Sequence, residues 1–375
     1  MQAHRFGDSV AMNRDGAPDG HRWLTWRRSG LIGVEVIVTA VALTVLFRGL
    51  RLSETAAAFR HANYWLLAPA VVFLVLDLQL RAVRWRLLLL PQRGLRHGNL
   101  FGATNVGYLV NDVLPFRVGE VARVFLIDQL EGTGKVRSAG SILVERGIDV
   151  IAMILLVISL FPFIDGPAWT RGPALFIGGA VVLGFVLLIV LSYVNETDRA
   201  FWKTWLRGVP RAGALLEHAA NTLLAAVRPL RSPATLAAIT GLTILIWLSG
   251  TMSFLMVLKA FRLDVGYPAA ALVVAATTLG MIVPSSPGYV GVFHAIAVKT
   301  LTEVFAIPKE QALTYAFAQH ALIYFVPAAL GVEFLRNHRP MWHALAESVG
   351  IRRDALAPKP PLDVRASGDA TRVEP

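Results

Sequence analysis

The chain has 375 residues, of which 55% are hydrophobic and only 16% are charged, whereas a soluble domain carries about 25% charged residues. This composition excludes an ordinary soluble enzyme, and the absence of Cys excludes disulfides, thiolate metal sites and cysteine nucleophiles. The formal charge of +11 would suggest nucleic acid in a soluble protein, but basic cytoplasmic loops explain it in a membrane protein, so we expect no nucleic-acid partner.

Continuous apolar runs of about 17 to 24 residues predict transmembrane helices, because that length crosses the hydrocarbon core of a bilayer. The first run, from Leu31 to Phe47, follows a basic segment, 1–30, and we expect it to act as an uncleaved anchor. The sequence therefore predicts an all-α polytopic membrane protein whose transmembrane domain covers residues 31–337. The runs predict about six full crossings, at 31–47, 64–80, 142–163, 172–194, 235–258 and 312–335.

Two further apolar regions, 99–130 and 268–298, are interrupted near their middles by Pro and Gly. Their arms of about 12 to 16 residues are roughly 18 to 24 Å long as helices, which is short of a 30 Å hydrocarbon core. We predict two re-entrant helical hairpins, with pairs of full crossings as the alternative. The predicted hairpin breaks are at Pro115, Gly119, Pro284, Pro287 and Gly291.

The distribution of Lys and Arg predicts that both termini are cytoplasmic in the cell (inner) membrane. With this orientation, the inside segments carry about three times as many Lys and Arg residues as the outside loops. The segment 196–233 becomes a cytoplasmic connector, and the Pro-rich tail 338–375 is expected to be cytoplasmic and largely disordered. The two hairpins then enter from opposite sides, an order of elements that resembles inverted-repeat transporters.

Ionisable side chains cluster at the end of the second predicted span. Asp77, Arg81 and Arg84 follow four- and three-residue steps, which place them on one face of a helix. Such residues at bilayer depth need partners or water. They either form an interfacial ladder that fixes topology, or they bring cations to a cytoplasmic opening where a lipid headgroup could bind.

The first hairpin break is rich in polar residues. Asn111 and Asp112 precede it, and Arg117, Glu120 and Arg123 follow. The N–H groups of a new half-helix, together with Arg117, favour an anion, and Glu120 could pair with Arg117 or Arg123. The alternative is an internal ion-pair network that only holds the hairpin together.

The third predicted full span, 142–163, begins with Glu145, Arg146 and Asp149. Glu145 and Asp149 are four residues apart and share a helix face, so they could share a proton or bind a cation. They could equally neutralise Arg117 and Arg123, because unpaired arginines near the bilayer core are costly.

The second hairpin break carries hydroxyl and Gly residues. Ser285, Ser286 and Gly288 could offer donors to a phosphate, or the hydroxyls could simply satisfy a broken helix. His294 and His320 are interpreted as interhelical hydrogen-bonding residues. No ATP-binding loop, metal-ligand spacing or hydrolase elbow is present, so we expect no cofactor, no metal and no catalytic residue.

Four motifs in this order resemble the lysylphosphatidylglycerol synthase transmembrane region family over about residues 30–337. They are Arg81-x-x-Arg84-Trp85-Arg86, Asn111-Asp112 through Pro115, Arg117, Gly119, Glu120 and Arg123, then Glu145-Arg146-x-x-Asp149, and Pro284-x-x-Pro287-Gly288-x-x-Gly291. In the bifunctional members of that family, the membrane region looks like a flippase for aminoacylated phosphatidylglycerol, and a separate soluble domain transfers the aminoacyl group from tRNA. Only about 40 residues follow Arg336, too few for a domain, so we expect that domain to be missing.

The expected function is the movement of an anionic phospholipid, or of a lipid-linked precursor, between leaflets. The alternatives are an accessory protein or enzyme in polyprenyl-linked glycan or lipid modification, and a scaffold without turnover. Membrane lipids are the expected partners, with a lipid- or glycan-synthesising enzyme as a further candidate. The predicted headgroup-binding residues are Arg81, Arg84, Asn111, Arg117, Glu120, Arg123, Ser285, Ser286 and Gly288, and the charge-compensating or proton-linked ones are Asp77, Asp112, Glu145, Arg146 and Asp149.

Overall fold

The computed structural model shows an all-helical protein. No strand occurs in the residues that the structure describes, which confirms the predicted fold class over those ranges. The predicted anchor, most of the connector and nearly all of the tail lie outside them. The described residues are 59–92, 94–114, 118–164, 178–187, 189–190, 193, 221–281, 287–338 and 340–341.

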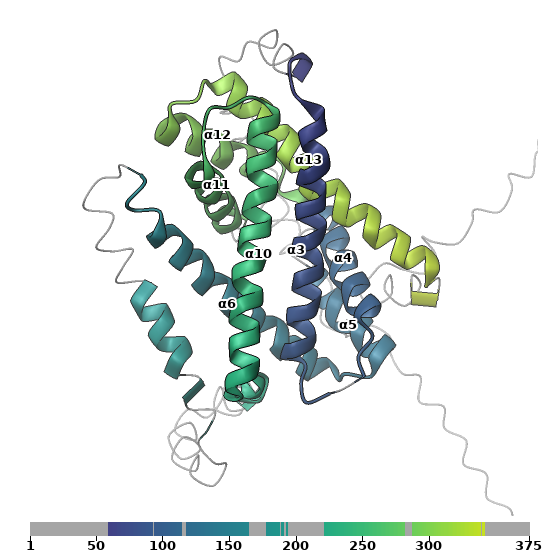
Figure 1. Ribbon diagram of the computed structural model, residues 1–375. Helices are drawn as coiled ribbons and strands as arrows, with labels where there is room; N and C mark the ends of the chain where they lie inside the picture. Colours follow the sequence, from purple (N-terminus) through teal and green to yellow (C-terminus); the bar gives the residue numbers. More distant parts are fainter. Residues whose placement is uncertain are drawn as a thin grey trace, which may run out of the picture.

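Three helices of the described ranges are long and apolar enough to cross a membrane: Tyr64–Leu88, Pro233–Ala260 and Lys309–Asn337. The first contains η1 (Tyr64–Leu66) and α3 (Leu67–Leu88), and the others are α10 and α13. They coincide with three of the predicted spans. The helices α3 and α10 pack side by side in opposite directions (Figure 1), and Asn63 at the start of one donates its N–H to the carbonyl of Ala260 at the end of the other.

The helix α6 (Lys135–Ser159) has 25 residues and crosses the molecule diagonally beside α10 (Figure 1). It begins earlier than the predicted span 142–163, directly after Gly134, whose φ of 80° suits the residue before a helix. The charges near its middle required partners on other helices, as described below. A shorter apolar helix, Gly178–Leu187, lies within the predicted span 172–194.

Both interrupted regions form pairs of short helices around a break. The first pair is α4 (His97–Val113) and α5 (Gly119–Glu131), and the second is α11 (Tyr267–Gly280) and α12 (Val292–Phe305). At 13 to 17 residues each, these helices are roughly 20 to 25 Å long. In Figure 1 the first pair lies in the lower half of the molecule and the second in the upper half.

The first hairpin closes tightly because two glycines face each other. A Cβ on Gly119 would overlap the carbonyl oxygen of Gly107, so α5 approaches α4 as closely as backbone allows. The Gly119 N–H donates to Asn111 Oδ1 at 2.7 Å, which ties the start of α5 to the end of α4.

Residues that flank the two breaks lie against each other. A short 3-10 helix, η3 (Pro287–Tyr289), follows the second break and packs against α4. Its Gly288, with a φ of 68°, lies against the ring of Tyr324 and the carbonyl oxygen of Asp112. His320 of α13 bonds to the Gly288 carbonyl through Nε2 at 2.8 Å, as an interhelical hydrogen-bonding residue does.

Three apolar cores hold the described elements. One gathers Trp85, Leu100 and Leu126 between α3, α4 and α5, and a second gathers Phe254 and Phe293 with neighbours from α10 to α13. The third lies between α3, α6 and the start of α10. The charged side chains of α3, α5 and α6 lie among these apolar surroundings, so they pair with one another.

Candidate functional site

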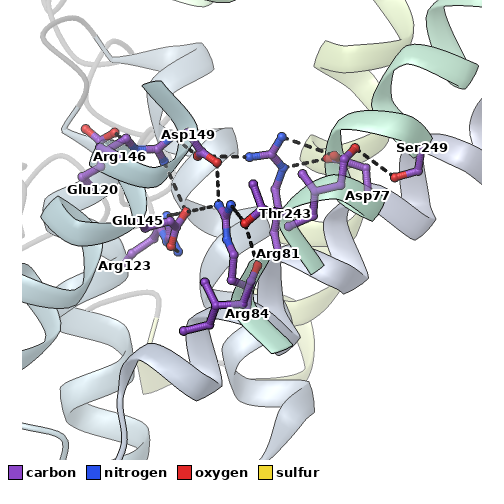
Figure 2. Close-up of polar contacts among 12 residues, drawn as sticks. Asp77, Arg81, Arg84, Glu120, Arg123, Glu145, Arg146, Asp149, Thr243 and Ser249 are labelled. Atoms are coloured by element: carbon purple, nitrogen blue, oxygen red, sulfur yellow. Dashed lines mark hydrogen bonds and ion pairs between the residues drawn. The ribbon is translucent and has the colours of Figure 1, made fainter. Parts of the chain in front are cut away.

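Eight charged side chains from three helices form one connected cluster (Figure 2), here named the arginine–carboxylate network. Four are arginines and four are carboxylates, so the network is formally neutral when all are ionised. Its members are Asp77, Arg81 and Arg84 of α3, Glu120 and Arg123 of α5, and Glu145, Arg146 and Asp149 of α6.

The charged face predicted for α3 exists. Arg81 donates from Nε to Asp77 Oδ2 at 2.7 Å and from Nη2 to Asp77 Oδ1 at 3.2 Å, a two-pronged pair one helical turn apart. Its Nη1 also reaches Asp149 Oδ2 of α6 at 3.5 Å. The carboxylate of Asp77 is thereby compensated within its own helix, and Arg81 extends the network across to α6.

Arg84 connects three helices. Its side chain is fully buried, its Nη2 lies 2.7 Å from Asp149 Oδ1, and its Nη1 donates to Thr243 Oγ1 of α10 at 3.1 Å. A buried arginine without a carboxylate would be strongly destabilising. The ion pair with Asp149 therefore stabilises the Arg84 cation inside the molecule.

Arg123 is held on two sides. Its Nη1 and Nη2 donate to the two carboxylate oxygens of Glu145 at 3.3 and 3.0 Å. Its guanidinium lies over the ring of Trp85, 4.3 Å from the centroid, in a cation–π contact. Trp85 is itself fixed, because its Nε1 donates to Ser141 Oγ at 2.9 Å.

Arg146 is the accessible member of the network. Its Nε lies 3.3 Å from Glu120 Oε1, and its Nη atoms lie 3.8 Å from Glu145 and 3.7 Å from Asp149. The side chains of Arg146 and Glu120 are 32% and 26% exposed, whereas that of Arg84 is 0% exposed. The network thus has a closed interior and an open end.

A cavity of about 520 Å³ adjoins this open end, between α5, α6 and α11. Glu120, Arg146 and Asp149 line its charged side. The other walls are almost entirely apolar and come from Val121, Val124, Ala139, Ile142, Leu143, Val150, Met153 and Thr278. We name it the front cavity. Its chemistry combines a charged pole with a hydrocarbon lining, which suits an amphipathic ligand.

The network contains eight of the fourteen residues predicted to bind a headgroup or to compensate charge. Asn111 instead caps the first break, and Gly288 lies at the second. Asp112 lies at the end of α4, where its Oδ2 is buried and has no hydrogen-bond partner in the described part of the chain. The remaining predicted residues, Arg117, Ser285 and Ser286, lie outside the described residues, as do the predicted breaks Pro115 and Pro284.

Gly291, one of the residues predicted at the second break, has a φ of 90° directly before α12, and its N–H donates to Nδ1 of His294 at 3.3 Å. Among the described ranges no group of three or more His, Asp or Glu side chains could hold a metal ion.

Sequence reasoning missed three contributors to the network's surroundings. Trp85 stood in the Arg-rich run, but its cation–π partner is Arg123 of another helix, which the neighbouring arginines of the run do not indicate. Thr243 and Ser141 carry hydroxyl groups in apolar helices. Nothing in their sequence context distinguishes them from hydroxyls that only bond to a carbonyl of their own helix. The Arg146–Glu120 pair was also not anticipated, since it joins two helices whose packing the sequence does not reveal.

Comparison with known proteins identifies the family. A family model described as the lysylphosphatidylglycerol synthase TM region matches residues 31–331, which is most of the chain and includes the whole network. No curated protein and no solved structure matches the chain. The match confirms the family expected from the four motifs: the chain belongs to the lysylphosphatidylglycerol synthase TM region family and is a membrane protein.

Proposed function

We propose that this protein moves an anionic phospholipid, or an anionic lipid-linked precursor, between the leaflets of the cell membrane. The observation that carries the proposal is the front cavity, in which Glu120, Arg146 and Asp149 form a charged pole beside apolar walls. A lipid has the same division into a charged headgroup and hydrocarbon chains. Membership of a family of membrane domains that are often flippase-like supports this choice.

The proposal includes a membrane arrangement of about six full crossings and two re-entrant hairpins. The short arms of the hairpins support it, since helices of roughly 20 to 25 Å do not cross a 30 Å core. The positions of the two hairpins at opposite ends of α3 and α10 (Figure 1) also support this arrangement, as does the contact between Asp112 and Gly288 beside their breaks. Broken helices that meet within the membrane are typical of transporter binding sites.

We place both termini and the lower end of Figure 1 on the cytoplasmic side. Exposed basic residues support this orientation, because cytoplasmic loops are enriched in Lys and Arg. Exposed basic residues occupy the last turn of α3, the residue before α4, the first turn of α6 and the start of η2, which directly precedes α10. They are Arg86, Arg96, Lys135, Arg137 and Arg228.

In this mechanism the headgroup phosphate binds Arg146. Arg146 is partly exposed at the front cavity, whereas Arg84 and Arg123 are buried against Asp149 and Glu145. An incoming phosphate replaces Glu120 as the partner of Arg146, with Arg81 as a second, deeper cation. The acyl or prenyl chains lie along the apolar walls and in the surrounding bilayer.

Headgroup binding would also change how α5 and α6 are held together. The Arg146–Glu120 pair joins these helices at the cavity opening, while the Arg123–Glu145 pair joins them farther inside. A ligand that breaks the outer pair but leaves the inner one favours a conformation in which the opening is wider. Because such a ligand binds the wider conformation more tightly than the closed one, its binding shifts the equilibrium between the two conformations.

The test compares lipid movement in proteoliposomes made with the wild type and with the Arg146→Gln variant. The reporters are labelled phosphatidylglycerol, phosphatidylcholine and a polyprenyl phosphate, and the measurement is their accessibility in the outer leaflet. We expect transfer of an anionic reporter by the wild type and a loss of about tenfold or more in Arg146→Gln, since a charge-assisted hydrogen bond is removed. Arg336→Gln, which removes an exposed pair with Glu333 outside the network, is the matched control.

Transfer that is equally fast in Arg146→Gln would contradict the role of the front cavity. No transfer of any of the three reporters by the wild type would contradict translocation of these lipid classes. Mass spectrometry of the recovered lipids separates the alternative, because an enzyme of lipid or glycan modification yields a product of new mass.

A further inference from the structure

A second cavity lies on the opposite face of α6 from the front cavity. It measures about 550 Å³ and is enclosed by α6, the helix around Gly178–Leu187 and α10. We name it the rear groove. We propose that the rear groove binds one acyl chain of an anionic glycerophospholipid whose phosphate is held at its lower end by Arg228 and Arg231. This site is separate from the translocation site proposed above and does not depend on it.

The walls of the rear groove are those of a hydrocarbon site. Apolar side chains such as Leu155, Val186 and Ile244 line it and remain about half exposed. Along α10 the lining runs from Leu236 to Leu248, a rise of about 18 Å. One leaflet contributes about 15 Å of the hydrocarbon core, so a single acyl chain matches the length of the groove.

The lower end of the groove is basic and structurally fixed. Leu230 lines the groove and lies in η2 (Arg228–Arg231) beside Arg231. The hydroxyl of Tyr193 donates to the Arg231 carbonyl at 2.7 Å, and the Arg231 guanidinium lies 5.0 Å from the centroid of the Tyr193 ring. Tyr193 thus holds Arg231 at this end of the groove, and Arg228 is exposed nearby. Basic side chains at a membrane surface attract anionic lipids, by about fivefold in affinity for each charge.

One hydroxyl connects the groove to the network. Thr243 lines the rear groove, and its Oγ1 accepts the hydrogen bond from Arg84. A chain in the groove consequently packs against the residue that holds Arg84 from the α10 side, and it fills the space behind α6.

The experiment uses phospholipids with a photoactivatable diazirine on one acyl chain, incorporated into nanodiscs with the full-length protein. Phosphatidylglycerol and phosphatidylcholine probes with identical chains are compared, and cross-linked peptides are mapped by mass spectrometry. We expect the phosphatidylglycerol probe to label the α6 and α10 walls at least about fivefold more than the phosphatidylcholine probe. The Arg228→Gln/Arg231→Gln variant should lose this preference, and Arg262→Gln, at the other end of α10, should keep it.

A second variant tests the groove without changing charge. Thr240 lines it and is exposed, so Thr240→Trp should fill the space and lower labelling of the α6 wall severalfold while labelling of the lipid-facing Phe325 region is unchanged. Equal labelling of the groove by both probes in the wild type would overturn the proposal. So would an unlabelled groove beside a labelled Phe325 region. Neither readout requires lipid to change leaflet, so the result is independent of the proposed function.

Discussion

Two carboxylates on α6 each compensate the charge of three arginines. Glu145 lies within 4.0 Å of Arg84, Arg123 and Arg146, and Asp149 lies within 3.7 Å of Arg81, Arg84 and Arg146. Removing either charge therefore leaves more than one buried or half-buried cation without its full compensation. In a low-dielectric interior that imbalance is far more costly than the loss of an exposed pair.

The Glu145→Gln substitution tests this at the residue scale. It keeps the size of the side chain but removes the charge opposite Arg123, so we expect a loss of about 3 to 5 kcal/mol in the free energy of unfolding. The measurement is the unfolding midpoint of the purified protein in detergent. Glu333→Gln, at an exposed pair on α13, is the control and should have almost no effect. A Glu145→Gln midpoint equal to that of the control would disprove the compensating role.

Arg123 requires a guanidinium rather than only a positive charge. It makes two hydrogen bonds to Glu145 and stacks on Trp85, and a lysine could reproduce neither the fork nor the stacking. We expect Arg123→Lys to lose about 2 kcal/mol of stability although its charge is unchanged. A denaturation curve that overlays the wild type would show that charge alone suffices at this position.

At the scale of elements, the breaks and faces were predictable, and the pairings between helices were not. Pro and Gly predicted both hairpin breaks, and the four- and three-residue steps predicted the charged face of α3, because both are local properties of the chain. The ion pairs Arg84–Asp149 and Arg123–Glu145 depend on which helices pack together. The sequence suggested that Glu145 could neutralise Arg123, but it gave no reason to connect Arg84 with Asp149, 65 residues away by their numbering.

The close approach of α4 and α5 gives a second prediction at this scale. In Gly119→Ala the new methyl group overlaps the Gly107 carbonyl, so the hairpin must open, at a cost of about 1 to 3 kcal/mol. Gly98→Ala is the matched control, because a methyl group there meets nothing within 4 Å and Ala favours the helix. Unfolding midpoints of the two variants should move in opposite directions. Equal shifts would mean that the glycine contact does not limit the packing of the hairpin.

At the scale of the whole molecule, the two hairpins lie at opposite ends of the α3 and α10 pair (Figure 1), and Asp112 and Gly288, which flank their breaks, lie together. The distribution of Lys and Arg along the sequence predicted that the hairpins enter from opposite sides of the membrane. The contact between Asp112 and Gly288 could not be predicted in this way, because it depends on how the helices pack. This arrangement brings both breaks, and the network beside the first of them, into one central region.

The orientation can be tested directly because the chain contains no Cys. Arg137 lies in the first turn of α6 and Arg262 lies just after the last residue of α10. Both are exposed, so each can be replaced by a single cysteine. We expect a membrane-impermeant maleimide to label Arg262→Cys in intact cells or spheroplasts and to label Arg137→Cys only after permeabilisation. The reverse pattern would invert the proposed topology.

The neutrality of the arginine–carboxylate network has an electrical consequence. Moving one elementary charge through a potential of 100 mV involves about 2.3 kcal/mol of work. Because the four arginines and four carboxylates sum to zero, a joint displacement of α3, α5 and α6 that carries the network as a unit performs almost no such work. The helices can then rearrange at the resting potential without being driven or held by it, and the voltage sensitivity of transport reports the charge on the lipid that is carried.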